Sequence, residues 1–247
     1  MRTGLGILGA SDGEQAMIDG VVFDKDGTLF DFRQSWGVWA ARMLDQLATD
    51  PAHAATIAAA IGFFPDRRDF APESPVIAGT AQDIAEVMLP HMQGFSQADL
   101  AARLNAFAQD AVMAPAVPLR PVLGALRDRG LKLGVATNDT EAPARAHLSA
   151  HGVLDLFDFV AGCDSGHGAK PAPGMCLAFA RQVGIDPARA VMVGDSTHDL
   201  IAGRAAGMRC VAVLTGIANA EALAPHADVV LADIGALGAW IDGLSAA

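Results

Sequence analysis

The chain has 247 residues, of which 52% are hydrophobic and 18% charged, and its formal net charge at pH 7 is −11. This composition is typical of a compact globular protein with a sizeable core and excludes a disordered chain. The negative charge argues against binding along a nucleic-acid backbone, which needs a basic surface. An anionic substrate would therefore need local attraction, from a metal ion or a few placed cations.

The cysteine pattern and the hydrophobic runs give no sign of disulfide bonds, a zinc site or a membrane span. Cys163, Cys176 and Cys210 are odd in number, widely spaced and without a CxxC pair, which indicates neither a disulfide framework nor a zinc site. No hydrophobic run reaches the roughly 20 residues of a membrane span. The N-terminal segment, with its acidic "SDGEQ", makes a poor signal peptide. We therefore expect a cytoplasmic protein without a membrane partner.

The first glycines of the chain imitate a nucleotide-binding motif. Gly4, Gly6 and Gly9 spell G-x-G-x-x-G, but the dinucleotide fingerprint needs a strand before it and a helix after it. Only three residues precede Gly4, and "SDGE" follows Gly9. We interpret residues 1–16 as an N-terminal tail or surface turn.

The first predicted strand, "GVVF" at 20–23, runs directly into "DKDGT". Strand alternation sends Asp24 and Asp26 the same way and sends the Lys25 side chain away from the site. The Gly-Thr pair at 27–28 suits a tight turn in which a hydroxyl can bind an aspartate. Two acids here suit Mg²⁺, or a nucleophile paired with a proton donor. The alternative is an ordinary solvated turn.

A long segment after this strand has a helical rather than a strand-like sequence pattern. Residues 35–114 contain no strand-like run, and we predict about four helices there, two of them opened by capping-box patterns at 80–83 and 96–99. So long an insert exceeds an ordinary strand–helix connection and predicts an α-helical cap domain. Its segment 62–79 is rich in proline and charge and is predicted to be a functional loop. Pro115 and Pro118 mark the return to the core.

The rest of the chain alternates between two kinds of segment. Short hydrophobic runs predict buried strands at 131–137, 157–162, 190–194, 210–216 and 228–232. Helix-length segments between them are 141–151, 174–183, 199–206 and 217–225. The alternation predicts a doubly wound, mostly parallel α/β sheet of Rossmann-like form, built from residues 17–34 and 115–247. Its strand ends should meet at one edge, where such sheets bind ligands.

Three more motifs lie at predicted strand or helix ends. "GVATND" ends a strand in Thr137 and Asn138, where a hydroxyl and a backbone N–H can hold a phosphate oxygen. "GAKPAPGM" places Lys170 at a helix start, where its charge can neutralise nearby acids and bind a phosphoryl group. "VMVGDSTHDL" supplies Asp195 as a metal ligand and Asp199 as an anchor for the lysine or for a metal-bound water.

These motifs together resemble the haloacid dehalogenase superfamily, in its phosphatase branch with an α-helical cap. The resemblance covers essentially the whole chain from Val21. It rests on D-x-D-G-T at 24–28, Thr137, Lys170 and G-D-x-x-x-D at 194–199. The runs "DGTLFD", "KPAPGM" and "VGDSTHDLIAGRAAGM" are most similar to phosphoglycolate phosphatases and their relatives.

The resemblance implies a role for each matching residue. Asp24 would be the nucleophile that forms an aspartyl-phosphate, and Asp26 the general acid and base. Mg²⁺ would be held by Asp24, the Asp26 backbone carbonyl and Asp195. The other implied residues are the phosphate-binding Thr137, Asn138 and Lys170, and the supporting Gly27, Thr28 and Asp199. Asp26 counts against dehalogenation, because a halide leaving group needs no acid and the dehalogenase motif lacks this residue.

Four residues are candidates for contacting the substrate beyond its phosphate: Arg33, Trp36, Arg67 and Arg68. The first two stand where the insert begins, where hinge or packing roles are the alternative. The arginine pair lies in the 62–79 segment and could bind a substrate carboxylate, or be a solvated surface pair. Glu73 and Ser74 are candidates by loop position alone, and we interpret His198 as a helix-start residue.

The sequence thus predicts a Mg²⁺-dependent phosphatase of a small phosphorylated metabolite, with phosphoglycolate as the best single guess. A phosphomutase of the β-phosphoglucomutase type shares all the motifs and the helical cap, and would pass the phosphoryl group to a sugar. A catalytically silent binding or regulatory protein is the third reading, which the full set of reactive side chains disfavours.

Overall fold

The computed structural model describes residues 17–244, so the glycine pattern at 4–9 lies outside the described residues. Six strands form one sheet in the order β5-β4-β1-β6-β7-β8, and every neighbouring pair is parallel. Their bounds are Gly20–Phe23 (β1), Lys132–Ala136 (β4), Phe159–Ala161 (β5), Ala190–Gly194 (β6), Arg209–Val213 (β7) and Val229–Leu231 (β8). The predicted doubly wound α/β fold is confirmed.

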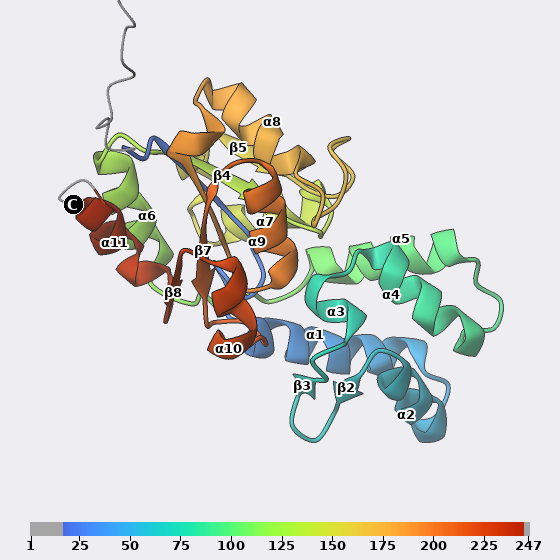
Figure 1. Cartoon of the computed structure of the whole chain (residues 1–247). Coiled ribbons are helices and arrows are strands. Elements are labelled where there is room, and N and C mark those ends of the chain that lie inside the picture. The colour runs from blue at the N-terminus through green and yellow to red at the C-terminus, as the bar shows by residue number, and fades with distance from the viewer. Residues whose placement is uncertain (1–16, 245–247) are drawn as a thin grey trace, which may run out of the picture.

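Helices connect these strands and cover both faces of the sheet (Figure 1). They are α6 (Leu119–Asp128), α7 (Glu141–Ala150), α8 (Gly174–Val183), α9 (Thr197–Ala205), α10 (Ala220–Leu223) and α11 (Leu237–Leu244). Single 3₁₀ turns lie at Leu154–Leu156, Pro187–Arg189, Ala224–His226 and Ile234–Ala236. Helices α7 to α10 lie in the predicted segments, whereas α6 and α11 were not predicted from the sequence. Within residues 17–244, no helix combines the length and hydrophobicity that crossing a membrane requires.

The first strand is buried on both faces, which explains its unbroken hydrophobic run. Val21 and Phe23 belong to the large core that includes residues of α6, α7 and α11. Val22 points to the opposite face and packs in the smaller core with residues of α8 and α9. This alternation fixes the register of β1 and therefore the position of the acids that follow it.

The insert after β1 forms a separate group of elements beside the α/β part (Figure 1). It contains α1 (Phe32–Leu47), α2 (Pro51–Ala60), α3 (Pro75–Ala78), α4 (Ala81–Met88), the 3₁₀ turn Leu89–His91 and α5 (Gln97–Gln109). It also contains an antiparallel pair, β2 (Phe63–Phe64) and β3 (Asp69–Phe70). The prediction of no strand in 35–114 is therefore wrong, because strands of two residues are too short to show a period.

The ends of the insert are defined by hydrogen bonds. Asp31 caps α1 by accepting from the Gln34 N–H over 2.8 Å, so this helix begins three residues before the predicted insert boundary. The Asp31 N–H in turn donates to the Ala114 carbonyl over 2.8 Å, which holds the outgoing and returning connections side by side. Both predicted N-caps, Thr80 for α4 and Ser96 for α5, are confirmed.

Candidate active site

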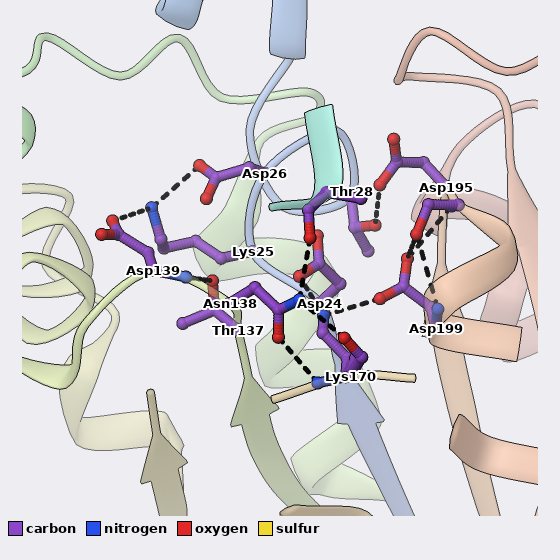
Figure 2. Close-up of polar contacts among 12 residues, drawn as sticks. Asp24, Lys25, Asp26, Thr28, Thr137, Asn138, Asp139, Lys170, Asp195 and Asp199 are labelled. Atoms are coloured by element: carbon purple, nitrogen blue, oxygen red, sulfur yellow. Dashed lines mark hydrogen bonds and ion pairs between the residues drawn. The ribbon is translucent and has the colours of Figure 1, made fainter. Parts of the chain in front are cut away.

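The candidate site lies at the carboxyl ends of three adjacent strands (Figure 2). Asp24 follows β1, Thr137 follows β4 and Asp195 follows β6. Because β4 and β6 flank β1 on opposite sides, the strand order reverses here, which is where open α/β sheets bind ligands. These side chains, together with Asp26 and Lys170, line one cavity between the sheet edge and the insert.

Lys170 is the buried cation of the site. Its Nζ lies 2.5 Å from Asp24 Oδ1 and 2.6 Å from Asp199 Oδ1. Burial works to lower the pKa of Lys170, but the charges of Asp199 and Asp24 outweigh it and raise that pKa. The lysine is therefore a permanent cation at the end of β1.

Asp199 serves two groups at once. Its Oδ2 accepts hydrogen bonds from the Ser196 N–H (3.0 Å) and the Ser196 hydroxyl (2.7 Å), which completes the capping box of α9. Its Oδ1 faces Lys170. Both oxygens are thus engaged by protein groups, so the geometry favours the lysine-anchoring role of Asp199 over a role at a metal ion.

A divalent cation fits Asp24 and Asp195. These two acids and Asp199 form a cluster in which one carboxylate oxygen of each lies within 4.8 Å of the others, and both Asp199 oxygens already have protein partners. Burial is the main cause that raises the pKa of Asp24 to about 7, opposed by Lys170 and reinforced by Asp199 and Asp26. Burial, with repulsion from Asp24 and Asp199, raises the pKa of Asp195 well above its usual value. The negative charge of these two carboxylates is not fully neutralised by nearby cations. Carboxylate oxygens are the hard ligands that Mg²⁺ prefers.

Two glycines make room for Asp195. A Cβ at Gly216 or at Gly27 would overlap the Asp195 carboxylate. Gly27 also has a φ of +82°, which strains any residue with a side chain. On the same turn, the Thr28 hydroxyl points to Asp195 Oδ1 at 3.4 Å. Gly27 and Thr28 were predicted as supporting residues, whereas Gly216 was not, because in the sequence it merely ends a predicted strand.

The two residues after β4 divide their tasks. The Thr137 hydroxyl oxygen accepts from the Asp139 N–H over 3.1 Å, which leaves the hydroxyl proton free to donate. The Asn138 amide nitrogen donates to the carbonyls of Ala78 (2.8 Å) and Lys170 (2.9 Å), and its oxygen accepts from the Lys170 N–H (2.8 Å). The Asn138 side chain therefore ties the insert to Lys170 and is not free for a phosphate.

Lys25 does not point away from the site, so that prediction is wrong. Its side chain is fully buried, and Nζ donates to Asp26 Oδ1 over 2.8 Å and pairs with Asp139 Oδ2 at 3.2 Å (Figure 2). Burial works to lower the pKa of Lys25, but Asp26 and Asp139 outweigh it and raise that pKa. The alternation rule failed because β1 ends at Phe23 and the chain turns before Asp26.

His147 links Lys25 to the insert by hydrogen bonds. Its Nδ1 lies 3.1 Å from Lys25 Nζ, and its Nε2 lies 2.8 Å from the Ala108 carbonyl in α5. These partners assign the proton to Nε2 in a neutral ring. Burial and the charge of Lys25 lower the pKa of His147 to about 4. Neither Asp139 nor His147 was predicted as a site residue, and the one sequence signal for either is the position of Asp139 next to Asn138.

Of the four candidate specificity residues, only Trp36 lines the cavity. Arg33 instead donates to Asp69 Oδ1 (3.1 Å) and to the Gly216 carbonyl (2.7 Å). It thereby joins β3 to the loop that packs on Asp195.

The arginine pair of the 62–79 segment also lies outside the cavity lining. The Arg67 guanidinium lies over the Phe64 ring, 4.5 Å from its centroid. Arg68 occupies a left-handed backbone position, with a φ of +50°. Glu73 and Ser74 line a groove next to the cavity, and His198, in the first turn of α9, lines both.

The chain is similar to known proteins over much of its length. A model of the family described as haloacid dehalogenase-like hydrolase matches residues 18–207. A phosphoglycolate phosphatase of Rhodospirillum rubrum is 36% identical over 148 residues, which make up 59% of this chain and 61% of that relative. The match thus spans less than two thirds of the relative's length.

Solved structures share the fold at low identity. A predicted phosphoglycolate phosphatase from Haemophilus somnus has a TM-score of 0.67 at 20% identity, covering 91% of this chain and 98% of that one. A β-phosphoglucomutase from Clostridium difficile has a TM-score of 0.64 at 19% identity, covering 92% and 97%. The family match runs from β1 through α9 and includes the acids and the lysine of the cavity. The chain therefore belongs to the haloacid dehalogenase-like hydrolase family.

Proposed function

We propose that this chain is a Mg²⁺-dependent phosphatase that hydrolyses a small phosphorylated metabolite through an aspartyl-phosphate on Asp24. One observation carries the proposal: Lys170 Nζ lies 2.5 Å from Asp24 Oδ1, in a cavity that Asp26 and Asp195 also line. Phosphoryl transfer depends mainly on positioning and charge neutralisation, and this arrangement supplies both. The family and the name of the R. rubrum relative support the same reaction.

In the first half-reaction the Asp24 carboxylate attacks the phosphorus atom. The bond from phosphorus to the leaving-group oxygen breaks, and Asp26 donates its proton to that oxygen. Lys170 neutralises charge on the phosphoryl oxygens, and the Thr137 hydroxyl and the Asn138 backbone N–H orient them. The products are an alcohol and a phosphorylated Asp24.

In the second half-reaction water attacks the same phosphorus atom. Asp26, now ionised, accepts a proton from that water, and the bond from phosphorus to Asp24 breaks. Inorganic phosphate leaves, the Asp24 carboxylate is restored and Asp26 is protonated again.

Mg²⁺ would be held by Asp24, Asp195 and the main-chain carbonyl of Asp26. When bound, it supplies positive charge for the phosphoryl oxygens and for the crowded carboxylates. Two protein features support this assignment: the raised pKa of both aspartates and the engagement of both Asp199 oxygens by protein groups.

The phosphomutase reading is the second candidate. It uses the same residues, and the fold similarity to the C. difficile enzyme does not separate the two. A sugar phosphomutase must hold a second phosphoryl group, whereas Lys170 is the one lysine or arginine that lines the cavity within residues 17–244. A silent binding protein ranks third, because the reactive side chains lie together. A cytoplasmic location without nucleic-acid or membrane partners stays a prediction.

The test is phosphate release from a panel of phosphorylated metabolites, beginning with phosphoglycolate, with Mg²⁺ and with a chelator. Wild-type protein should release phosphate only with Mg²⁺, and Asp24→Asn should lower turnover by at least 10³-fold without loss of folded structure. Asp45→Asn, at an exposed acid of α1, is the matched control and should keep full activity. Unchanged turnover in Asp24→Asn would exclude this nucleophile, and a trapped bisphosphorylated sugar would favour the mutase.

A further inference from the structure

The wall that the insert turns toward the catalytic acids is almost entirely apolar. Its main side chains are Trp36, Trp39, Val76, Ile77, Ile84 and Leu104. Apart from the two indole N–H groups, Asn105 is the polar side chain that the described part of the insert contributes to the cavity. This wall faces the position of the leaving group, because the sheet edge opposite it holds the phosphoryl-binding residues.

The charge balance of the cavity is already negative without a substrate. Five carboxylates line it: Asp24, Asp26, Asp139, Asp195 and Asp199. Against them stand Lys170 in the lining and Lys25 buried behind it, where Asp26 and Asp139 already pair with the ammonium group. With Asp26 protonated for its proposed role as general acid and a divalent cation bound, these charges would cancel, and the phosphoryl group of the substrate would make the balance negative again. The phosphoryl group itself uses Lys170, so within the described residues no lysine or arginine remains for a second anion.

The N-termini of α4 and α9, which both border the cavity, are not free for an anion either. The first turn of α4 is closed by a capping box in which the Asp83 carboxylate accepts the Thr80 N–H over 2.7 Å. The first turn of α9 is closed in the same way by Asp199 and Ser196. Each helix end therefore holds a carboxylate of its own, which occupies the place where a substrate carboxylate would bind.

The indoles offer hydrogen bonds without charge. Trp36 and Trp39 both line the cavity, and the Nε1 of each is buried with no acceptor in residues 17–244. Such N–H groups can satisfy a hydroxyl or carbonyl oxygen of a ligand, but they do not neutralise a carboxylate removed from water.

We infer that the substrate is the phosphate monoester of an uncharged, largely apolar alcohol, and that an ester with a carboxylate on its leaving group, such as phosphoglycolate, is selected against. This inference rests on the proposed phosphatase function and specifies its substrate class. The leaving group packs on the tryptophan, isoleucine and leucine side chains of the insert, and Asn105 is its neutral polar contact.

Three small esters test the charge preference: 2-phosphoglycolate, its carboxamide and propyl phosphate. The first two have nearly the same shape and differ in charge. With Mg²⁺ at pH 8, kcat/KM for the carboxamide and for propyl phosphate should exceed that for phosphoglycolate by at least tenfold.

A gain-of-function variant tests the position of the leaving group. Asn105→Arg adds a cation at a half-buried position of the apolar wall, and should raise kcat/KM for phosphoglycolate relative to the carboxamide by at least tenfold. Ala102→Arg adds the same charge on the exposed face of the same helix, α5, and should leave that ratio within about twofold.

Two results would overturn the inference: a wild-type preference for phosphoglycolate over its carboxamide, or equal effects of the two arginine variants. Failure of the proposed phosphatase function looks different, because no ester, including 4-nitrophenyl phosphate, would then be hydrolysed. A binding measurement covers that outcome. Calorimetry on Asp24→Asn with Mg²⁺ should show at least tenfold weaker binding of phosphoglycolate than of the carboxamide, and equal or tighter binding would refute the charge preference without turnover.

Discussion

Lys25 donates a hydrogen bond to Asp26 over 2.8 Å, so the residue proposed as general acid and base is held by its own neighbour in the chain. His147 holds Lys25 in turn, at 3.1 Å, and is itself bonded to the Ala108 carbonyl of the insert at 2.8 Å. A line of hydrogen bonds thus runs from the insert to Asp26. It gives Lys25 a positioning role, because the lysine touches Asp26 and does not line the cavity.

Lys25→Met should release the Asp26 side chain while keeping the length of the buried side chain. We expect kcat/KM to fall by about 10²-fold for alkyl phosphates, which need a proton on the leaving oxygen, and by much less for 4-nitrophenyl phosphate, whose leaving group needs none. The measurement is the ratio of the two values in wild type and variant.

Lys132→Met is the control for this prediction, because Lys132 is a partly exposed lysine paired with Asp158 far from the cavity. It should leave the ratio unchanged. The thermal midpoint of Lys25→Met separates unfolding from loss of positioning. Equal losses for alkyl and aryl esters in a folded variant would contradict the positioning role.

Gly216→Ala should disturb the metal site selectively. The added Cβ would overlap Asp195 Oδ2, so the carboxylate must turn away from the position it shares with Asp24. We expect the Mg²⁺ concentration for half-maximal activity to rise at least tenfold.

Gly124→Ala provides the matched comparison. Gly124 lies inside α6, and a Cβ there meets nothing within 4 Å. This variant should keep its Mg²⁺ requirement and gain about 0.5–1 kcal/mol in the free energy of unfolding, because alanine is the better helix former. An unchanged Mg²⁺ requirement in Gly216→Ala would show that Asp195 tolerates the extra carbon.

Metal binding should depend on pH near neutrality. Without metal, burial raises the pKa of Asp24 to about 7, and Asp195 is raised as well. Mg²⁺ binds the ionised carboxylates, so protons compete with it below these values. Calorimetry should show the Mg²⁺ affinity rising by roughly tenfold or more between pH 6 and pH 7. A flat affinity across this interval would contradict the raised pKa of Asp24.

His147 should make the fold sensitive to acid. Burial lowers the pKa of His147 to about 4 in the folded protein, from the ordinary value of 6.5 that we take for the solvent-exposed imidazole of the unfolded chain. Between these values the unfolded state binds more protons, so the free energy of unfolding falls as the pH is lowered from 6.5 to 4 and this contribution then levels off. The full contribution is about 3 kcal/mol.

The difference between wild type and His147→Gln isolates this effect from the titrating aspartates. Glutamine can still donate to the Ala108 carbonyl and accept from Lys25, but it does not titrate. Urea denaturation of both proteins with a chelator should show the wild type losing about 3 kcal/mol relative to the variant as the pH is lowered through this window. Parallel curves would rule out a buried neutral histidine.

The sequence was sufficient to predict those features that depend on residues close together in the chain. The strands could be predicted because their β-branched runs are continuous, and the acids could be placed because β1 ends where its hydrophobic run ends. Helix α6 was missed because its ten residues include Pro121 and Gly124, which hide a helical pattern. Helix α11 likewise carries two glycines among its eight residues.

The sequence was insufficient wherever partners are distant. Lys25 and His147 lie 122 positions apart, and neither residue type nor spacing predicts their contact. The same holds for Arg33, whose partner carbonyl at Gly216 is 183 positions away. Arg67 was a reasonable candidate for a substrate carboxylate by its charge, but only the fold shows that its guanidinium lies over Phe64 outside the cavity.

Asn138 has a consequence for how the site opens. Two of its three hydrogen bonds go to the backbone of Lys170, and only one, to the Ala78 carbonyl, reaches the insert. If the insert lifts from the sheet edge, this side chain loses one bond, which water can replace, while its clamp on Lys170 persists. Lys170, the proposed phosphate-binding cation, is therefore held in place by Asn138 whether or not the insert contacts the sheet edge. Closure of the insert would add a single hydrogen bond to a site whose lysine is already positioned.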